Sequence, residues 1–177
     1  MKKLLFILML TVSSVTVLTS RVLAQAPPPA STALSGIGDE STYYKFASLV
    51  RSANLDGTLA ALGTYTVFAP HNVIFRNMSP GKLDSLTSDP AKLALVLKAH
   101  IIKGKFAKAD IIKKLGLGKG KTTFTNILGE KLTLTRTKDN QLLLTDAKGN
   151  QAYFLNYDIM DPHGVIHGID NVLDYGK

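Results

Sequence analysis

The stretch TVFAPHNVIF, at residues 66–75, has the pattern of a short buried strand that turns into a helix. Its first residues are apolar, and Pro70 ends the strand because proline has no amide hydrogen to donate to a neighbouring strand. Asn72 then stands where a helix cap is expected, and Phe75 can pack inward from the helix that follows. We therefore expect a strand, a proline turn and a helix at this point, all with structural roles.

The stretch GVIHGIDNVL, at residues 164–173, has the same apolar character near the end of the chain. Its pattern predicts a buried strand, so we expect His167 within it to be neutral and to bond its ring nitrogens to backbone groups. We expect the same of His100, which lies in an apolar stripe with Leu97 and Ile101. The two stretches are expected to be neighbouring strands, with Phe68 and Ile166 in one shared apolar core.

Helical patterns dominate the chain up to about residue 115, and strand patterns follow. Helical spacing of apolar residues, together with Ser-Pro and Asp-Pro starts, predicts helices at residues 46–53, 56–62, from 80 onward, 90–101 and 106–115. Apolar runs bounded by turn residues predict strands at residues 122–128, 131–136, 142–145, 152–159 and 164–172. Helices followed by strands indicate an α+β fold, with the helices packed on one side of a mainly antiparallel sheet.

The two quoted stretches resemble the first and second signatures of the fasciclin (FAS1) domain family, and HIIKGK at residues 100–105 looks like its middle segment. The usual threonine after the first signature's proline is His71 here. The resemblance implies a single fasciclin-like wedge of N-terminal helices on a twisted sheet, at residues 41–175. It also implies a role in the adhesion of cells and extracellular matrix. The positions that match the family's structural motifs are Thr66, Phe68, Ala69, Pro70, Asn72, Phe75, His100, Gly164, Ile166, His167, Ile169 and Asp170.

The N-terminus has the layout of a secretory signal peptide at residues 1–24, with two lysines, an apolar run and small residues that end at Ala24. Cleavage after Ala24 is expected, with Ala26 as the second choice and an uncleaved membrane anchor as the alternative. Residues 25–40 are rich in Pro, Ala and Ser and predict a flexible tether. The chain has no cysteine, which excludes disulfides and a lipid-modified N-terminal cysteine. We expect an exported protein of the single-domain bacterial type, in the periplasm, on the cell surface or secreted.

Two residues near the second signature are candidates for adhesion. Asp158 and Ile159 resemble the Asp-Ile tract that animal matrix proteins with fasciclin domains present to integrin receptors, at a matching distance before the second signature. The alternative is structural, with Ile159 in the core and Asp158 as its solvated neighbour.

Lysines gather in the middle of the chain and suggest a site for anionic glycans or lipid headgroups. A plain solvated basic face is the alternative. The region has no arginine and one aromatic residue, so specific recognition of nucleic acid is not expected. Loss of residues 1–24 would lower the net charge from +8 to +5, because three cations and no acid are removed. The candidate residues are Lys98, Lys103, Lys105, Lys108, Lys113 and Lys114.

No arrangement typical of a catalytic nucleophile, a phosphate-binding loop or a dinucleotide fold is present in the sequence. The two histidines lack a third partner for a metal, so neither a metal nor a cofactor is expected. Four aspartates near the C-terminus, Asp158, Asp161, Asp170 and Asp174, leave a glycan hydrolase as a minor alternative. The sequence therefore predicts a monomeric, non-enzymatic adhesion or matrix-interaction module outside the cytoplasm, or a periplasmic or surface binder of anionic glycan or lipid. The expected partners are cell-surface or matrix proteins or polysaccharides, with proximity to a membrane as a further option.

Overall fold

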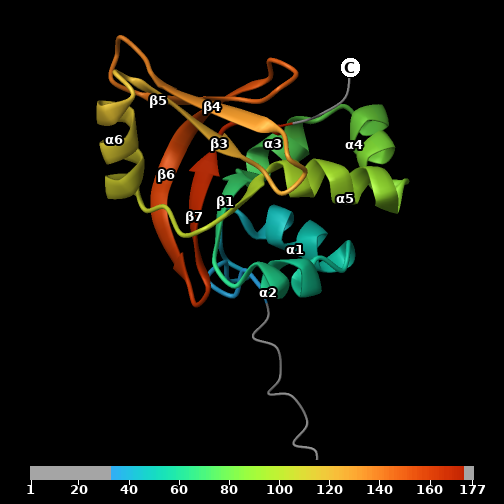
Figure 1. Cartoon of the computed structure of the whole chain (residues 1–177). Coiled ribbons are helices and arrows are strands. Elements are labelled where there is room, and N and C mark those ends of the chain that lie inside the picture. The colour runs from blue at the N-terminus through green and yellow to red at the C-terminus, as the bar shows by residue number, and fades with distance from the viewer. Residues whose placement is uncertain (1–32, 174–177) are drawn as a thin grey trace, which may run out of the picture.

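Seven strands form one sheet, in the order β2-β1-β7-β6-β5-β4-β3, in a computed structural model that describes residues 33–173 (Figure 1). The strands are β1 (Tyr65–Pro70), β2 (Ile101–Lys103), β3 (Lys121–Thr125), β4 (Lys131–Arg136), β5 (Leu142–Thr145), β6 (Gln151–Asp161) and β7 (Gly164–Ile169). The helices are α1 (Tyr44–Ser52), α2 (Asp56–Leu62), α3 (Asn72–Asn77), α4 (Pro80–Thr87), α5 (Pro90–Ala99) and α6 (Lys108–Leu117). All pairs of neighbouring strands are antiparallel except β1 and β7, so the predicted α+β class with a mainly antiparallel sheet is confirmed.

The two stretches quoted from the sequence are neighbouring parallel strands, β1 and β7, as expected. Their register pairs Val67 with Ile166 and Phe68 with His167. Successive side chains of a strand point to opposite faces of the sheet, so Phe68 and Ile166 lie on opposite faces. The expectation that Phe68 and Ile166 share one core is wrong. Val67, the residue before Phe68, is the side chain that lies in the same core as Ile166.

Two apolar cores lie on the two faces of β1 and β7, and every residue of both strands is buried. We call the first the helical core; it contains apolar residues of α1, α2, α3, α4 and α5 together with Val67 and Ile166. We call the second the sheet core; it contains Phe68, Ile169 and residues of β3 to β6, and α6 covers it through Ile111 and Leu115. The helices were expected on one side only, but Figure 1 shows α6 apart from α1–α5, beyond β1 and β7.

The sheet is strongly curled, because its two edge regions touch. An isolated antiparallel bridge joins Ile102 in β2 to Asn126 just after β3, and Ile127 donates its amide to the Ile101 carbonyl at 2.9 Å. Every strand contributes to the sheet core, and the bridge covers the edge of β2 where it meets Asn126 and Ile127. The twisted sheet that the resemblance implied is therefore closed at one point.

Several element ends differ from those predicted. The α5 helix stops at Ala99, and Ile101 begins β2, so the apolar stripe at 90–101 is part helix and part strand. The α6 helix begins at Lys108 rather than at residue 106, and β7 ends at Ile169 rather than at 172. The helix α2 has the predicted bounds, and Gly63 ends it with a φ of 74°, a conformation that glycine adopts without strain.

Asn72 does not cap α3, contrary to expectation. His71 occupies the cap position, and its Nδ1 accepts a hydrogen bond from the Val73 amide at 3.1 Å. Asn72 is the first residue of the helix, and its side chain joins α3 to the segment before α1. Its Oδ1 accepts from the Lys45 amide at 2.8 Å, and its Nδ2 donates to the Ser41 carbonyl at 3.0 Å. The residue remains structural, in a different role.

The described chain begins inside the fold. Ala33, Leu34 and Ile37 are buried in the helical core, and the Gly36 amide donates to the Asp161 carboxylate at 3.1 Å. The tether expected over residues 25–40 is therefore too long. The small residues around Leu34 and Ile37 suggested a flexible segment, but both side chains are buried. The expected signal peptide, the tether up to residue 32 and Asp174 lie outside the described residues. Within 33–173, none of the helices is long and apolar enough to cross a membrane.

Candidate binding surfaces

Strand β6 carries an irregular bulge at the position of the candidate adhesion residues. Its register against β7 shifts between Phe154 and Asn156 and again between Asn156 and Ile159. Asp158 lies in this bulge with a φ of 57°, in the left-handed region that few non-glycine residues adopt. Bulges change the direction of side chains along a strand, and here Asp158 faces solvent at a point where the strand alternation is broken.

Asp158 also makes structural hydrogen bonds across the molecule. Its Oδ1 accepts from the Lys108 amide at 2.8 Å and so satisfies a backbone donor in the first turn of α6. Its own amide donates to Nδ1 of His167 at 3.3 Å. Residue 158 therefore holds the start of α6, which is fifty residues earlier in the chain.

His167 lies beneath the bulge and is buried, as expected. Its Nε2 donates to the Phe106 carbonyl at 2.8 Å, because a carbonyl oxygen can only accept, and its Nδ1 accepts from Asp158. Burial lowers the pKa of His167, while the Phe106 carbonyl and the charge of Asp158 oppose that shift. The ring is thus neutral and connects β7 to the bulge and to the segment before α6.

The other two residues of this region differ in exposure. Ile159 is half-buried against the helical core, whereas the side chain of Met160 is 59% exposed. Asp158 and Met160 are therefore exposed to solvent, and so is the apolar residue Leu155 on the same strand. We call Asp158, Ile159 and Met160 the bulge tract.

The second candidate surface is formed by lysines of α6 and the preceding loop. Lys105, Lys113 and Lys114 line a groove of about 330 Å³ together with Phe106 and Leu117. Lys114 Nζ lies 5.3 Å from the centroid of the Phe106 ring, which keeps the ammonium at the groove wall. We call this the lysine groove.

The remaining candidate lysines lie elsewhere. Lys108 Nζ is 4.2 Å from the ring centroid of Tyr157, beside the bulge tract rather than in the groove. Lys98 is half-buried on α5, and Lys103 ends β2; neither lines the lysine groove. The structure therefore brings together three of the six predicted lysines.

His100 is fully buried, and both of its ring nitrogens bond to the backbone, as expected. Nδ1 donates to the Val96 carbonyl at 2.7 Å, and Nε2 accepts from the Leu173 amide at 2.9 Å. The histidine thus joins the end of α5 to the end of the described chain.

The other motif residues have structural partners as well. The hydroxyl of Thr66 donates to the Gly104 carbonyl at 2.7 Å and accepts from the Phe106 amide at 2.9 Å, which fixes the loop before α6. A Cβ on Gly164 would lie 2.5 Å from the Tyr65 ring, so only glycine fits there.

The C-terminal aspartates form hydrogen bonds with different parts of the fold. Asp161 is buried and accepts from the Tyr65 hydroxyl at 2.5 Å. Burial and this carboxylate together raise the pKa of Tyr65. Asp170 accepts from the Tyr153 amide at 2.7 Å. Within residues 33–173, no three acidic or histidine side chains form a group that could hold a metal ion.

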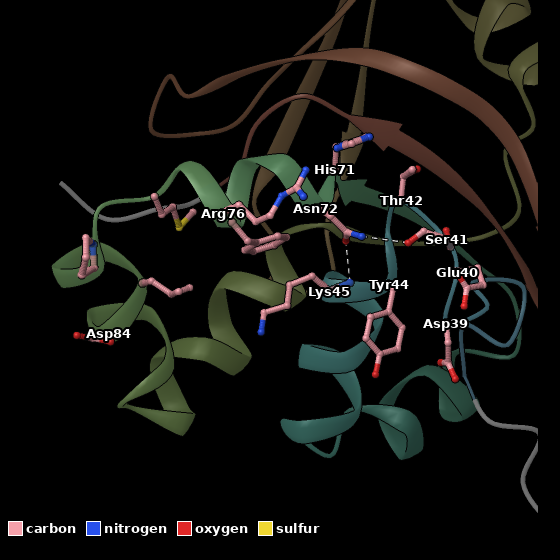
Figure 2. A pocket seen from close by; sticks show the side chains of 14 residues that line it. Asp39, Glu40, Ser41, Thr42, Tyr44, Lys45, His71, Asn72, Arg76 and Asp84 are labelled. Carbon is pink, nitrogen blue, oxygen red and sulfur yellow. Dashed lines mark hydrogen bonds between the residues drawn. The ribbon is translucent and has the colours of Figure 1, made fainter.

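A third surface feature is a pocket of about 770 Å³ that the sequence did not predict. It lies where the segment before α1, the α3 helix and the α4 helix meet. Figure 2 shows Asp39 and Glu40 at one end, Asp84 at the other, and Lys45 and Arg76 between them. Its residues come from three separate segments and follow no motif, so only the packing of the helices reveals them. We call it the helix pocket.

Comparison with known proteins agrees with this architecture. A family profile described as "Fasciclin domain" matches residues 41–175. The uncharacterised protein sll1735 of Synechocystis is 29% identical over 140 residues, which cover 79% of this chain and 94% of that protein. Rabbit transforming growth factor-beta-induced protein ig-h3 is 28% identical over 146 residues; the match covers 82% of this chain and only 20% of the rabbit protein.

A solved structure gives the same fold. The FAS1 domain pair from the insect cell adhesion molecule Fasciclin I superposes with a TM-score of 0.62 at 18% identity, over 75% of this chain and 45% of that one. The family profile covers most of the chain and nearly all of the described fold. This protein therefore belongs to the fasciclin domain family.

Proposed function

We propose that this chain is an exported, monomeric and non-enzymatic adhesion module of the fasciclin type. The observation that carries the proposal is the family match, which spans residues 41–175. A protein with the same fold, Fasciclin I, is described as an insect cell adhesion molecule. The partner is a protein or polysaccharide of a cell surface or matrix.

Export is supported by the sequence of residues 1–24, with its two lysines, apolar run and Ala24. The absence of a catalytic role is supported by the way the aspartates are used. Asp158, Asp161 and Asp170 each accept a hydrogen bond from a backbone amide, at three different places in the fold. Paired acid and base carboxylates of a glycosidase would instead face each other across a cleft. We expect no turnover of model glycosides.

The proposed contact is the bulge tract. It combines a charged residue, Asp158, with an exposed apolar one, Met160, on a backbone that the bonds to Lys108 and His167 hold in place. The hydrogen bond to the Lys108 amide already restricts the Asp158 side chain, so this residue loses little conformational entropy when it binds a partner.

The experiment is an adhesion count with beads coated with residues 25–177. Asp158→Ala is a poor test, because it removes the acceptor for the Lys108 amide. Asp158→Asn keeps an oxygen at that position and removes the charge. We expect this variant to lose most of the adhesion. The matched control is Asp139→Asn, an exposed aspartate in the turn between β4 and β5. Equal loss in both variants, or in neither, would reject the bulge tract as the contact.

The lysine groove supports a second candidate function, the binding of an anionic glycan or lipid. Among the described residues, Asp110 is the only acid in its lining, and its carboxylate accepts from the Ala107 amide at 3.0 Å. A Lys113→Ala, Lys114→Ala double variant should then bind less to carboxylated polysaccharide or to vesicles that contain anionic lipid. Binding by pure charge attraction would fall steeply with salt, whereas binding that persists in high salt indicates a fitted site. The polysaccharide and vesicle arms distinguish the two ligands.

A further inference from the structure

We propose that the helix pocket is a docking site for a segment of a partner protein that carries an apolar side chain next to an acidic one. The site lies at the junction of α1, α3 and α4 and contains neither the bulge tract nor the lysine groove. The proposal depends on this junction alone and does not require the adhesive role.

The rear wall of the pocket is already rigid. Asn72 clamps the segment before α1 through the Lys45 amide and the Ser41 carbonyl, and its own amide donates to the Thr42 carbonyl at 2.7 Å. Figure 2 shows these side-chain bonds as dashed lines across the pocket wall. The pocket volume of about 770 Å³ falls within the range of about 300–1,000 Å³ that ligand sites occupy.

The floor is apolar and suits an aliphatic or aromatic side chain. Phe75, Met78 and Leu83 line it. Phe75 is only 4% exposed and so presents no flat face on which a sugar ring could stack. The rings of Tyr44 and His71 also line the pocket, and the guanidinium of Arg51 lies 5.7 Å from the centroid of the Tyr44 ring. This lining favours a peptide side chain over a saccharide.

The rim carries charges of both signs. Lys45 and Arg76 are exposed in the middle of the pocket, and among the described residues neither is paired with a carboxylate. An acidic side chain that enters the pocket would gain a charge-assisted contact with either cation. Asp39, Glu40 and Asp84 at the two ends would repel a polyanionic chain. A polypeptide can present an apolar side chain and an acidic one close together. Such a pair matches the apolar floor of the pocket and the two cations beside it.

The test uses short synthetic peptides with one Leu and one Asp at varied spacing in a Gly/Ser background. Two matched peptide sets replace the Asp by Lys or the Leu by Ser. We expect the best Leu–Asp peptide to bind the full-length protein about tenfold more tightly than either matched peptide. No preference for Leu–Asp peptides would overturn the proposal.

A charge reversal separates a true site from general attraction. In a Lys45→Glu, Arg76→Glu double variant, the Leu–Asp peptide should lose its binding and the Leu–Lys peptide should gain it. The control is Lys121→Glu at the start of β3, which should change neither affinity. Circular dichroism confirms that each variant is folded. Unchanged binding in the double variant, or binding of a galacturonate oligomer in place of the peptides, would contradict the proposal.

Discussion

His167 makes the stability of this protein depend on pH. Burial lowers its pKa below the ordinary value of 6.5, so the folded state prefers the neutral ring more than the unfolded chain does. As the pH falls below about 6.5, the unfolded chain binds a proton that the folded ring resists, and stability is lost until the folded pKa is reached. Protonation would also place two donors, Nδ1 and the Asp158 amide, against each other.

We expect the midpoint of thermal unfolding to decrease from pH 7.5 to pH 5, and to decrease less in His167→Gln. Glutamine can still donate to the Phe106 carbonyl but does not titrate. The measurement is a series of melting curves for both proteins. An identical pH dependence in the two would show that His167 does not control this loss.

Metal ions should not stabilise the protein through its buried histidines. All four ring nitrogens of His100 and His167 already bond to backbone groups. A metal would have to replace these bonds and recruit distant ligands. We expect zinc or calcium to leave the melting temperature unchanged, and a shift of several degrees would contradict this expectation.

The apolar neighbours of His100 and His167 allowed their burial and backbone bonding to be predicted from sequence. Two of the partners, Leu173 and Phe106, were not predictable, because they lie far from the histidines along the chain. The same reason explains why Asp158 was not recognised as a partner of α6. Asp158 and Lys108 come together only when β6 and the start of α6 are packed side by side in the folded protein.

At the level of elements, two glycines of different environments give a matched test of the packing. A Cβ on Gly168 in β7 would lie 2.0 Å from the Tyr43 hydroxyl oxygen, whereas a Cβ on Gly116 in α6 would meet nothing within 4 Å. The first position needs glycine for space. The second is an open helical site where alanine is the better helix former.

We expect Gly168→Ala to lower the free energy of unfolding by about 3 kcal/mol, because the Cβ forces Tyr43 or the strand to move. Gly116→Ala should raise it by about 0.5–1 kcal/mol. Urea unfolding of the two variants measures both. A Gly168→Ala protein as stable as the unchanged chain would refute the close packing of β7 on Tyr43.

Element boundaries were predictable where turn residues stand at both ends. The strands β4 and β5 and the helix α2 have the predicted bounds, because glycine, aspartate and asparagine flank them. The end of α5 was missed because Ile101 continues the apolar stripe, although the chain has already entered β2. Periodicity alone does not separate a helix from a short buried strand that follows it.

On the scale of the whole molecule, residues 33–40 pack as part of the domain. Leu34 is fully buried and Ile37 is 2% exposed, although the family match begins at residue 41. The composition of residues 25–40 suggested a tether, and it gave no sign that Leu34 and Ile37 are buried in the helical core. Leu34 and Ile37 are buried because they pack in the helical core with Tyr65, whose hydroxyl donates to Asp161. These contacts form only in the folded protein.

A chain that begins at residue 41 should therefore be less stable than one that begins at residue 33. Burial of Leu34 and Ile37 contributes about 4 kcal/mol, at roughly 2 kcal/mol for each fully buried aliphatic side chain. Chemical unfolding of both chains measures the difference. Equal stability would mean that residues 33–40 do not pack as described.

We propose above that this domain acts outside the cytoplasm by adhesion. The most direct measurement is the surface attachment of cells that produce the full chain, counted against cells that produce the same chain without residues 1–24. We predict excess attachment only in cells that produce the full chain, and its loss in Asp158→Asn. Equal attachment of both cell types would contradict the claim.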